Sequence, residues 1–178
     1  MKQNKLFWVF TLLAGAWMLM GTMVYADELL WTIGTPDKSD AEFLGAPNEY
    51  TRCPRMAQYV IGESVPQRDW PFMQLGPADS WGGACAHTNQ IIFSLKEKPV
   101  ENQECRLVLH FKNVHKEVPP MLELRLNGQV ARKLQLKSGQ GDALAQGRVK
   151  EVIGQQEEVL INSSLLNQGE NFLQIADI

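Results

Sequence analysis

The sequence lacks most of the patterns by which metal-dependent and nucleophilic enzymes are recognised. It contains no Cys-x-x-Cys pair and no Cys/His spacing typical of a zinc site. It also contains no Gly-x-Ser-x-Gly nucleophile elbow, no glycine-rich phosphate loop before a helix and no recognisable calcium loop. We therefore expect no catalytic residue, no metal ligand set and no cofactor, while a structural calcium held by loop carboxylates stays compatible with the sequence.

Two weaker chemical hypotheses remain open. Asp69 and Asp79 form a carboxylate pair within one aromatic-rich segment, and glycoside cleavage uses paired carboxylates whose spacing is spatial. A metal site is also conceivable, although its spacing matches no ligand motif. Its candidate ligands are Asp79, His87, His110 and His115.

The first 26 residues have the pattern of a secretory signal peptide. Lys2 and Lys5 precede the uncharged run Leu6–Met20. Val24 and Ala26 supply the small or permissive residues of a cleavage site, and no cysteine nearby indicates a lipid anchor. The alternative is a membrane anchor, but the run is shorter than the roughly 20 residues that a spanning helix needs. We expect cleavage after Ala26, a secreted or periplasmic protein, and no membrane contact after cleavage.

The remaining chain, residues 27–178, has the length of one ordinary domain with a real core. Loss of Lys2 and Lys5 with the leader would change the net charge from −3 to −5. An acidic surface of mixed charges argues against nucleic acid and anionic membranes as partners.

Cysteine content is low and odd in number, which limits the possible disulfides. Cys53, Cys85 and Cys105 can close at most one bridge, in any of three pairings. The sequence does not choose between such a bridge and three reduced, partly buried thiols.

Short alternating apolar runs dominate the chain from Gln90 onward. Apolar residues recur at every second position, as in a strand with one buried face. Asn127-Gly128 lies between two such runs and predicts a type I′ hairpin turn. The predicted strands are residues 29–33, 59–61, 91–97, 105–111, 121–126, 129–136, 149–153, 159–161 and 172–175.

Little else in the chain is regular. Single helical turns are predicted at 37–43 and 162–166, and a glycine-rich connection at 137–146. Many short strands with turn residues between them are typical of an all-β fold, an antiparallel β-sandwich or jelly roll.

One irregular segment, residues 59–87, carries the candidate binding residues. Flat aromatic rings bury the apolar faces of sugars, and an arginine fork binds hydroxyl or carboxylate oxygens. The alternatives are structural: tryptophans that close the ends of the sandwich and an Arg68–Asp69 salt bridge that fixes the loop. We favour the core for Trp31 and Trp70, whereas Trp81, followed by Gly82-Gly83, fits either role. The candidate ligand-binding residues are Trp81, Arg68, Asp69, Trp70, Asp79 and His87.

Three stretches of the chain resemble a known module. They are LWTIGTPDKSDAEF, YVIGESVPQRDWPFMQLGPADSWGGACAHTNQIIFSL, and the ELRLNG hairpin together with SSLLNQGENFLQI. Over residues 29–176 the chain is similar to the C-terminal β-sandwich module, domain III, of rhamnogalacturonan lyases of polysaccharide lyase family 4. This resemblance implies a galactose-binding-domain-like jelly roll that is carbohydrate-binding-like and not catalytic. In that family the module continues with a further strand holding an aromatic pair, so we expect either a fragment or a sandwich that closes differently.

The resemblance implies an exported module that recognises pectic or related plant polysaccharide. One alternative is a structural domain that packs against a catalytic lyase or hydrolase domain without binding sugar. Another is a polysaccharide lyase in its own right, for which the sequence offers no defensible base or nucleophile. The resemblance does not say which glycan is bound, whether binding needs calcium, or which oligomer forms.

Overall fold

The computed structural model describes residues 29–37, 39–49, 52–101, 103–141 and 152–178. The predicted signal peptide lies outside these residues, as does most of the strand predicted at 149–153. Residues 31–178 form one compact unit. Among the described residues, no helix is long and apolar enough to cross a membrane.

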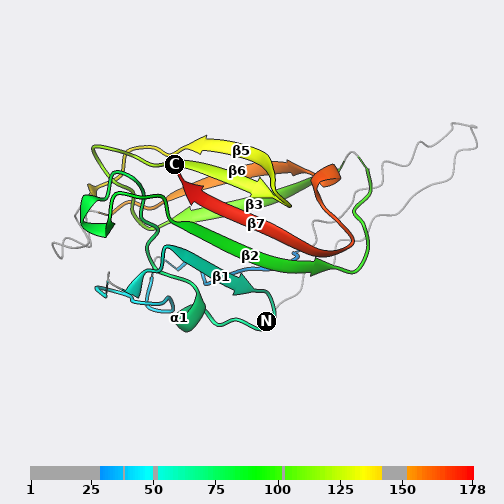
Figure 1. Cartoon of the computed structure of the whole chain (residues 1–178), viewed down its shortest axis with the longest axis horizontal. Coiled ribbons are helices and arrows are strands. Elements are labelled where there is room, and N and C mark those ends of the chain that lie inside the picture. The colour runs from blue at the N-terminus through cyan, green and yellow to red at the C-terminus, as the bar shows by residue number, and fades with distance from the viewer. Residues whose placement is uncertain (1–28, 38, 50–51, 102, 142–151) are drawn as a thin grey trace, which may run out of the picture. The chain divides into compact units, whose positions relative to one another are not determined.

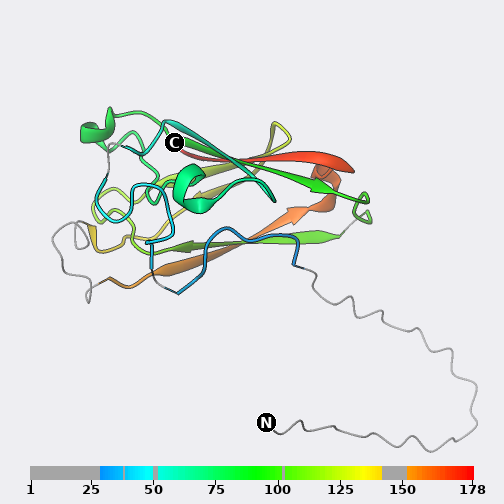
Figure 2. The ribbon, with the colours of Figure 1, turned by 90° about the horizontal axis from the view of Figure 1, so that it is seen from below.

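Seven strands in the described part of the chain form two sheets, so the predicted all-β sandwich is confirmed. The larger sheet has the order β1-β2-β7-β4-β5, and β3 pairs with β6 in the smaller sheet. Figure 1 shows the larger sheet face on, and Figure 2 shows the two sheets as separate layers. The strands are β1 (Met56–Val60), β2 (Thr88–Leu95), β3 (Glu104–Phe111), β4 (Met121–Leu126), β5 (Gln129–Gln135), β6 (Gln155–Asn162) and β7 (Gly169–Asp177).

The core follows the period of two that the sequence displays. In β4, Leu122, Leu124 and Leu126 are buried, while the residues between them face outward. Leu107 of β3 and Val159 and Ile161 of β6 face them from the smaller sheet and belong to the same apolar cluster. The other buried apolar members are Ile91, Phe93, Val114, Leu136, Leu166, Leu173 and Ile175.

The predicted hairpin joins β4 and β5. Asn127 and Gly128 both have positive φ, 51° and 81°, as a type I′ turn requires. The pairing register shifts between Leu124 and Arg125, which indicates a β-bulge in this ladder. The predicted turn at 162–166 is also present, as the 3₁₀ helix Ser163–Leu165, with Asn162 Oδ1 accepting the Ser164 N–H at 2.8 Å.

Two predictions near the start of the domain are wrong. Residues 31–33 do not form a strand; Trp31 and Ile33 instead pack against the core, with Trp31 and Phe93 ring centroids 5.6 Å apart. Packing of these two side chains against the core holds residues 31–33 in place, although their backbone does not pair with a neighbouring strand. Of the turn predicted at 37–43, the described residues 39–43 form no helix, because the side chains of Asp37 and Ser39 accept hydrogen bonds from backbone N–H groups two residues on.

Two further details differ from the expected antiparallel pattern. β1 pairs with β2 in parallel, so the larger sheet is mixed. Val152 and Ile153 are described and are not in a strand, whereas β6 begins at Gln155 and is longer than the predicted 159–161.

Candidate functional site

The segment between Pro71 and His87 leads from helix α1 (Pro66–Asp69) to strand β2 and displays Trp81 on a short 3₁₀ helix, η2 (Ser80–Gly82). Hydrogen bonds between residues of this turn fix its conformation. Asp79 Oδ2 accepts the Gly76 N–H at 2.9 Å, and the Asp79 carbonyl accepts the N–H groups of Gly82 and Ala84. The indole of Trp81 is therefore carried on a hydrogen-bonded turn.

The Trp81 side chain is exposed, whereas Leu75 of the same segment is buried and anchors the turn. The residue is 59% exposed, whereas Leu75, on the same segment, is only 4% exposed. A Cβ atom on Gly82 would lie 2.6 Å from Leu75 Cδ1, so any larger residue there would have to displace the Leu75 side chain. Gly83 has a φ of +99°, a conformation that other residues rarely adopt. Of the two roles that the sequence left open for Trp81, the core role does not apply.

Arg55 lies beside this turn and was not predicted. Its Nη2 atom is 3.3 Å from the position that a Cβ on Gly83 would occupy. The side chain is exposed, and within the described residues no carboxylate pairs with its guanidinium. Its backbone carbonyl accepts the Thr88 N–H at 2.9 Å, which fixes Arg55 to the start of β2. Only tertiary structure could reveal this, because Arg55 and Gly83 are far apart in sequence.

His87 lies at the base of the same segment but is buried, with 3% of its surface exposed. Its Nδ1 lies 2.9 Å from the Pro54 carbonyl oxygen, and its backbone N–H donates to the Leu75 carbonyl. Its Nε2 is buried and has no hydrogen-bond partner among the described residues. In this conformation His87 fixes the segment, and its ligand contact stays a prediction.

Gln74 ties the segment to the larger sheet. Its Nε2 donates to the carbonyl oxygens of His87 and Ile175, at 3.1 and 2.9 Å. Its Oε1 accepts from the buried Asn89 at 3.3 Å. The bonds to Asn89 of β2 and Ile175 of β7, together with the bond to His87 just before β2, fix the segment against the end of the sheet, so Trp81 is presented on a rigid support.

Asp177, at the end of β7, is the titratable group that the sequence analysis missed. It is 8% exposed, and its burial, together with the nearby charge of Asp79, raises its pKa to about 6. The sequence pattern could have predicted this burial, because Leu173 and Ile175 face the core and the alternation along the strand places residue 177 on the same side. Asp79 thus accepts a hydrogen bond from the Gly76 N–H, while its negative charge opposes ionisation of the Asp177 carboxyl.

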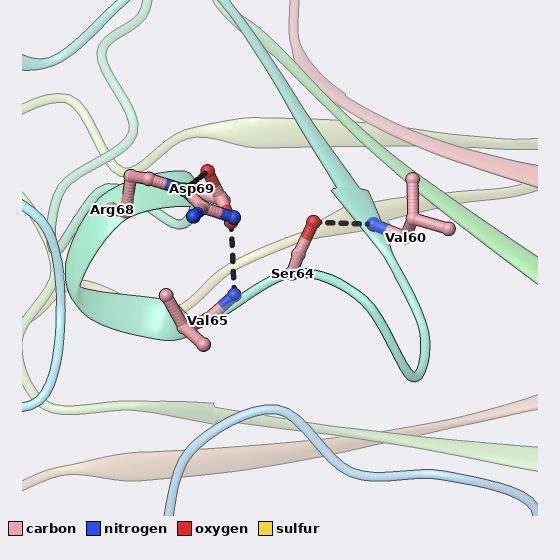
Figure 3. Close-up of polar contacts among 5 residues, drawn as sticks. All are labelled: Val60, Ser64, Val65, Arg68 and Asp69. Atoms are coloured by element: carbon pink, nitrogen blue, oxygen red, sulfur yellow. Dashed lines mark hydrogen bonds and ion pairs between the residues drawn. The ribbon is translucent and has the colours of Figure 1, made fainter.

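Arg68 and Asp69 form the predicted salt bridge. The Arg68 Nε and Nη2 atoms donate to the two Asp69 oxygens, both at 2.7 Å (Figure 3). Asp69 Oδ2 also accepts the Val65 N–H at 2.9 Å, which closes the first turn of α1. The hydrogen bonds from Arg68 and then from Val65 lower the pKa of Asp69 to about 2. A ligand role for this pair stays a prediction.

Trp70 follows the pair at the end of α1 and packs inward. Its ring meets that of Tyr59 edge to face, with centroids 5.9 Å apart, and it contacts the core cluster. The six predicted residues therefore fall into two groups. Asp79, Trp81 and His87 belong to the turn above β2, while Arg68, Asp69 and Trp70 belong to α1. Both groups are also joined to other parts of the chain, since the Pro54 carbonyl lies 2.9 Å from His87 Nδ1 and the Trp70 carbonyl accepts the Leu44 N–H.

Metal chemistry finds no support among the described residues. None of their His, Cys, Asp and Glu side chains forms a group of three or more that could hold a metal ion. The carboxylates of Asp69 and Asp79 are each engaged by their own loop, at Val65 and Gly76. The three cysteines are free thiols, and burial raises the pKa of Cys53 and Cys105.

Comparison with known proteins supplies one match. The family model described as CBM-like, polysaccharide lyase family 4, domain III, matches residues 29–178. A search of curated proteins finds no match.

Proposed function

The chain belongs to the CBM-like domain III family of polysaccharide lyase family 4, and from this membership we propose that it is an exported, non-catalytic module that binds pectic polysaccharide. The family match supports a carbohydrate partner and a catalytic partner domain. Pectic specificity, export and the absence of activity are our inferences from the resemblance and from the leader-like first 26 residues.

The observation that carries the binding proposal is the exposed indole of Trp81. An aromatic ring that is 59% exposed on a hydrogen-bonded turn offers a flat face at little entropic cost. Gly82 and Gly83 keep the backbone beside the ring free of side chains. Arg55 next to Gly83 adds a guanidinium that suits the carboxylate of a uronic acid.

The test is isothermal titration of the purified protein with rhamnogalacturonan oligosaccharides. Trp81→Ala should weaken binding about two- to tenfold, because stacking on one aromatic ring contributes on the order of 0.5–1.5 kcal/mol. The matched control is Leu160→Ala, which removes an apolar side chain that is 53% exposed on the other sheet. No heat with any plant glycan would refute the proposal, and equal binding by Trp81→Ala would remove Trp81 from the site.

A second candidate function is packing against a catalytic domain without sugar binding. Val108 of β3 and Leu160 of β6 are diagonal neighbours on the outer face of the smaller sheet, and they are 36% and 53% exposed. Exposed apolar pairs of this kind suit a protein partner. Loss of co-purification with a lyase catalytic domain in Leu160→Arg, with sugar binding absent in the wild type, would favour this function.

A third possibility is lyase activity of the chain itself. Release of unsaturated uronate ends by the purified protein, followed by ultraviolet absorbance, tests it directly. Because the Asp79 carboxylate is held by the Gly76 N–H and the His87 ring is buried against Pro54, we expect no release above background.

A further inference from the structure

The outer face of the larger sheet carries a row of glutamines that the sequence analysis did not single out. The register places Gln58 of β1 opposite Gln90 of β2, and Gln90 opposite Gln174 of β7. Arg125 of β4 continues the row opposite Gln174. With neighbouring strands about 4.8 Å apart, the four positions span about 14 Å across the sheet.

All four side chains lie on the face that points away from the core. In β2 the buried residues are Asn89, Ile91 and Phe93, so Gln90 lies on the opposite face. The same alternation places Gln58, Gln174 and Arg125 there. Figures 1 and 2 agree that no described segment crosses in front of this face.

The three glutamine amides are not used inside the molecule. Within the described residues, none of Gln58, Gln90 and Gln174 makes a side-chain hydrogen bond. Each amide offers two donors and two acceptor lone pairs. Three such planar groups side by side match a chain of vicinal hydroxyls, which also donate and accept.

An apolar row runs beside the amide row. Val60, Ile92 and Phe172 lie opposite one another on β1, β2 and β7, one step along the same face. They are partly exposed. A surface with hydrogen-bonding groups in one row and apolar groups in the next fits a sugar ring, which has both kinds of edge.

The charge at one end of the row selects the kind of saccharide. Glu123 accepts from Arg125 Nε at 2.5 Å and lies 3.1 Å from Lys133 Nζ. One carboxylate therefore faces two cations, and both cations are about half exposed. These three side chains together carry a net charge of +1, which complements an acidic sugar at this end of the row.

We propose that this outer face, through Gln58, Gln90, Gln174 and Arg125, binds an acidic polysaccharide chain lying across the strands, as a second contact surface apart from Trp81. The inference rests on the proposed carbohydrate-binding function. We therefore expect the affinity for the polysaccharide to fall when these side chains are changed, and also when the carboxylates of the polysaccharide are removed.

The test compares Gln174→Glu with Gln156→Glu. Both substitutions make the same change of charge, but Gln156 is exposed on β6 of the other sheet. The probes are rhamnogalacturonan oligosaccharides and the same oligosaccharides after carboxyl reduction, titrated calorimetrically. We expect Gln174→Glu to weaken binding of the acidic form about tenfold and that of the reduced form less, with Gln156→Glu close to wild type.

The outcomes separate the two proposals. Wild-type protein that binds neither probe overturns carbohydrate binding and this inference with it. Binding by the wild type that Gln174→Glu leaves unchanged overturns only the sheet-face inference. Sedimentation of the wild type as a dimer that Gln174→Glu disrupts, with sugar affinity unaltered, would assign the face to a second copy of the chain and also overturn the inference. Thermal melts of both variants verify that they fold.

Discussion

Gly76 lies directly against the carboxyl group of Asp177: a Cβ atom on residue 76 would come within 2.0 Å of Asp177 Oδ2 and 2.4 Å of its Cγ. The two residues are about a hundred positions apart, and this contact holds the segment bearing Trp81 to the end of β7. It forms one side of a polar cluster that also contains Asp79, His87 and Gln74.

The contact predicts that Gly76→Ala destabilises the fold. The added methyl group overlaps a buried side chain, so we expect a loss of about 2–3 kcal/mol in the free energy of unfolding. Asp177→Ala removes the overlapping group, and the double variant should therefore lose less than the sum of the two single losses. Chemical denaturation of the four proteins measures the coupling.

Gly62→Ala serves as the control for that cycle. A Cβ on Gly62 would meet nothing within 4 Å, although its φ of +89° makes any side chain unfavourable there. Its cost, about 1 kcal/mol, should be the same with or without Asp177→Ala. A strictly additive result for Gly76 and Asp177 would show that the segment moves aside.

Asp177 also predicts a dependence of stability on pH. Its pKa is about 6 in the folded protein, above the ordinary 3.8, so the folded state holds the proton more tightly. Stability should therefore fall as the pH rises from about 4 to about 6 and then remain low. Asp177→Asn removes this loss and should stabilise the protein at pH 7 by about 1–2 kcal/mol.

Urea denaturation at several pH values between 4 and 7.5 checks this prediction. Asp79→Asn provides a comparison, because the charge of Asp79 is the smaller of the two causes and burial the larger. Asp79→Asn should restore only part of the stability that the wild type loses between about pH 4 and about pH 6. An Asp177→Asn protein as sensitive to pH as the wild type would contradict the assignment.

Asp69 predicts the opposite dependence. Its pKa is lowered to about 2 by Arg68 and by the Val65 N–H, so its contribution is present above about pH 4 and is lost as the pH falls toward 2. Asp69→Asn should lower the melting temperature at pH 7 but not at pH 2. Arg68→Gln should have a smaller effect, since the bond from Val65 remains. Melting curves at both pH values distinguish the two partners.

The buried Asn171 predicts a strong effect of a single substitution. Its side chain is 0% exposed and makes four hydrogen bonds, accepting from Asn127 and from the Asn167 N–H and donating to the Asn167 and Gly169 carbonyls. Asn171→Leu leaves these groups unpaired and should cost about 3 kcal/mol or more. Denaturant titration measures the loss.

Asn162→Ala is the matched control for Asn171. Asn162 is exposed and makes one capping bond, to the Ser164 N–H, so its loss should cost about 1 kcal/mol. Equal costs at the two positions would show that the Asn171 network is replaceable by water.

Much of this fold follows from local patterns. The period of two predicts which faces of β2, β3 and β4 are buried, because a strand turns successive side chains to opposite sides. Asn127-Gly128 predicts its turn because these residues accept positive φ. The three quoted stretches also predict the family, which the match over 29–178 confirms.

The site could be predicted only in part. The sequence identifies Trp81 and the Arg68–Asp69 pair as candidates, because their types and neighbours are local features. It could not show that His87 is buried, that Arg55 lies beside Gly83, or that Trp31 packs on Phe93 without a strand. Each of these depends on contacts between residues distant in the chain.

The sequence by itself determined the class of fold, the hairpin and the family, because backbone geometry and side-chain alternation act over a few residues. Only the tertiary structure decided the parallel placement of β1 beside β2, and with it the alignment of Gln58, Gln90 and Gln174 in one row. Register between strands is set by packing and hydrogen bonds across the whole sheet, and no short stretch of residues contains that information.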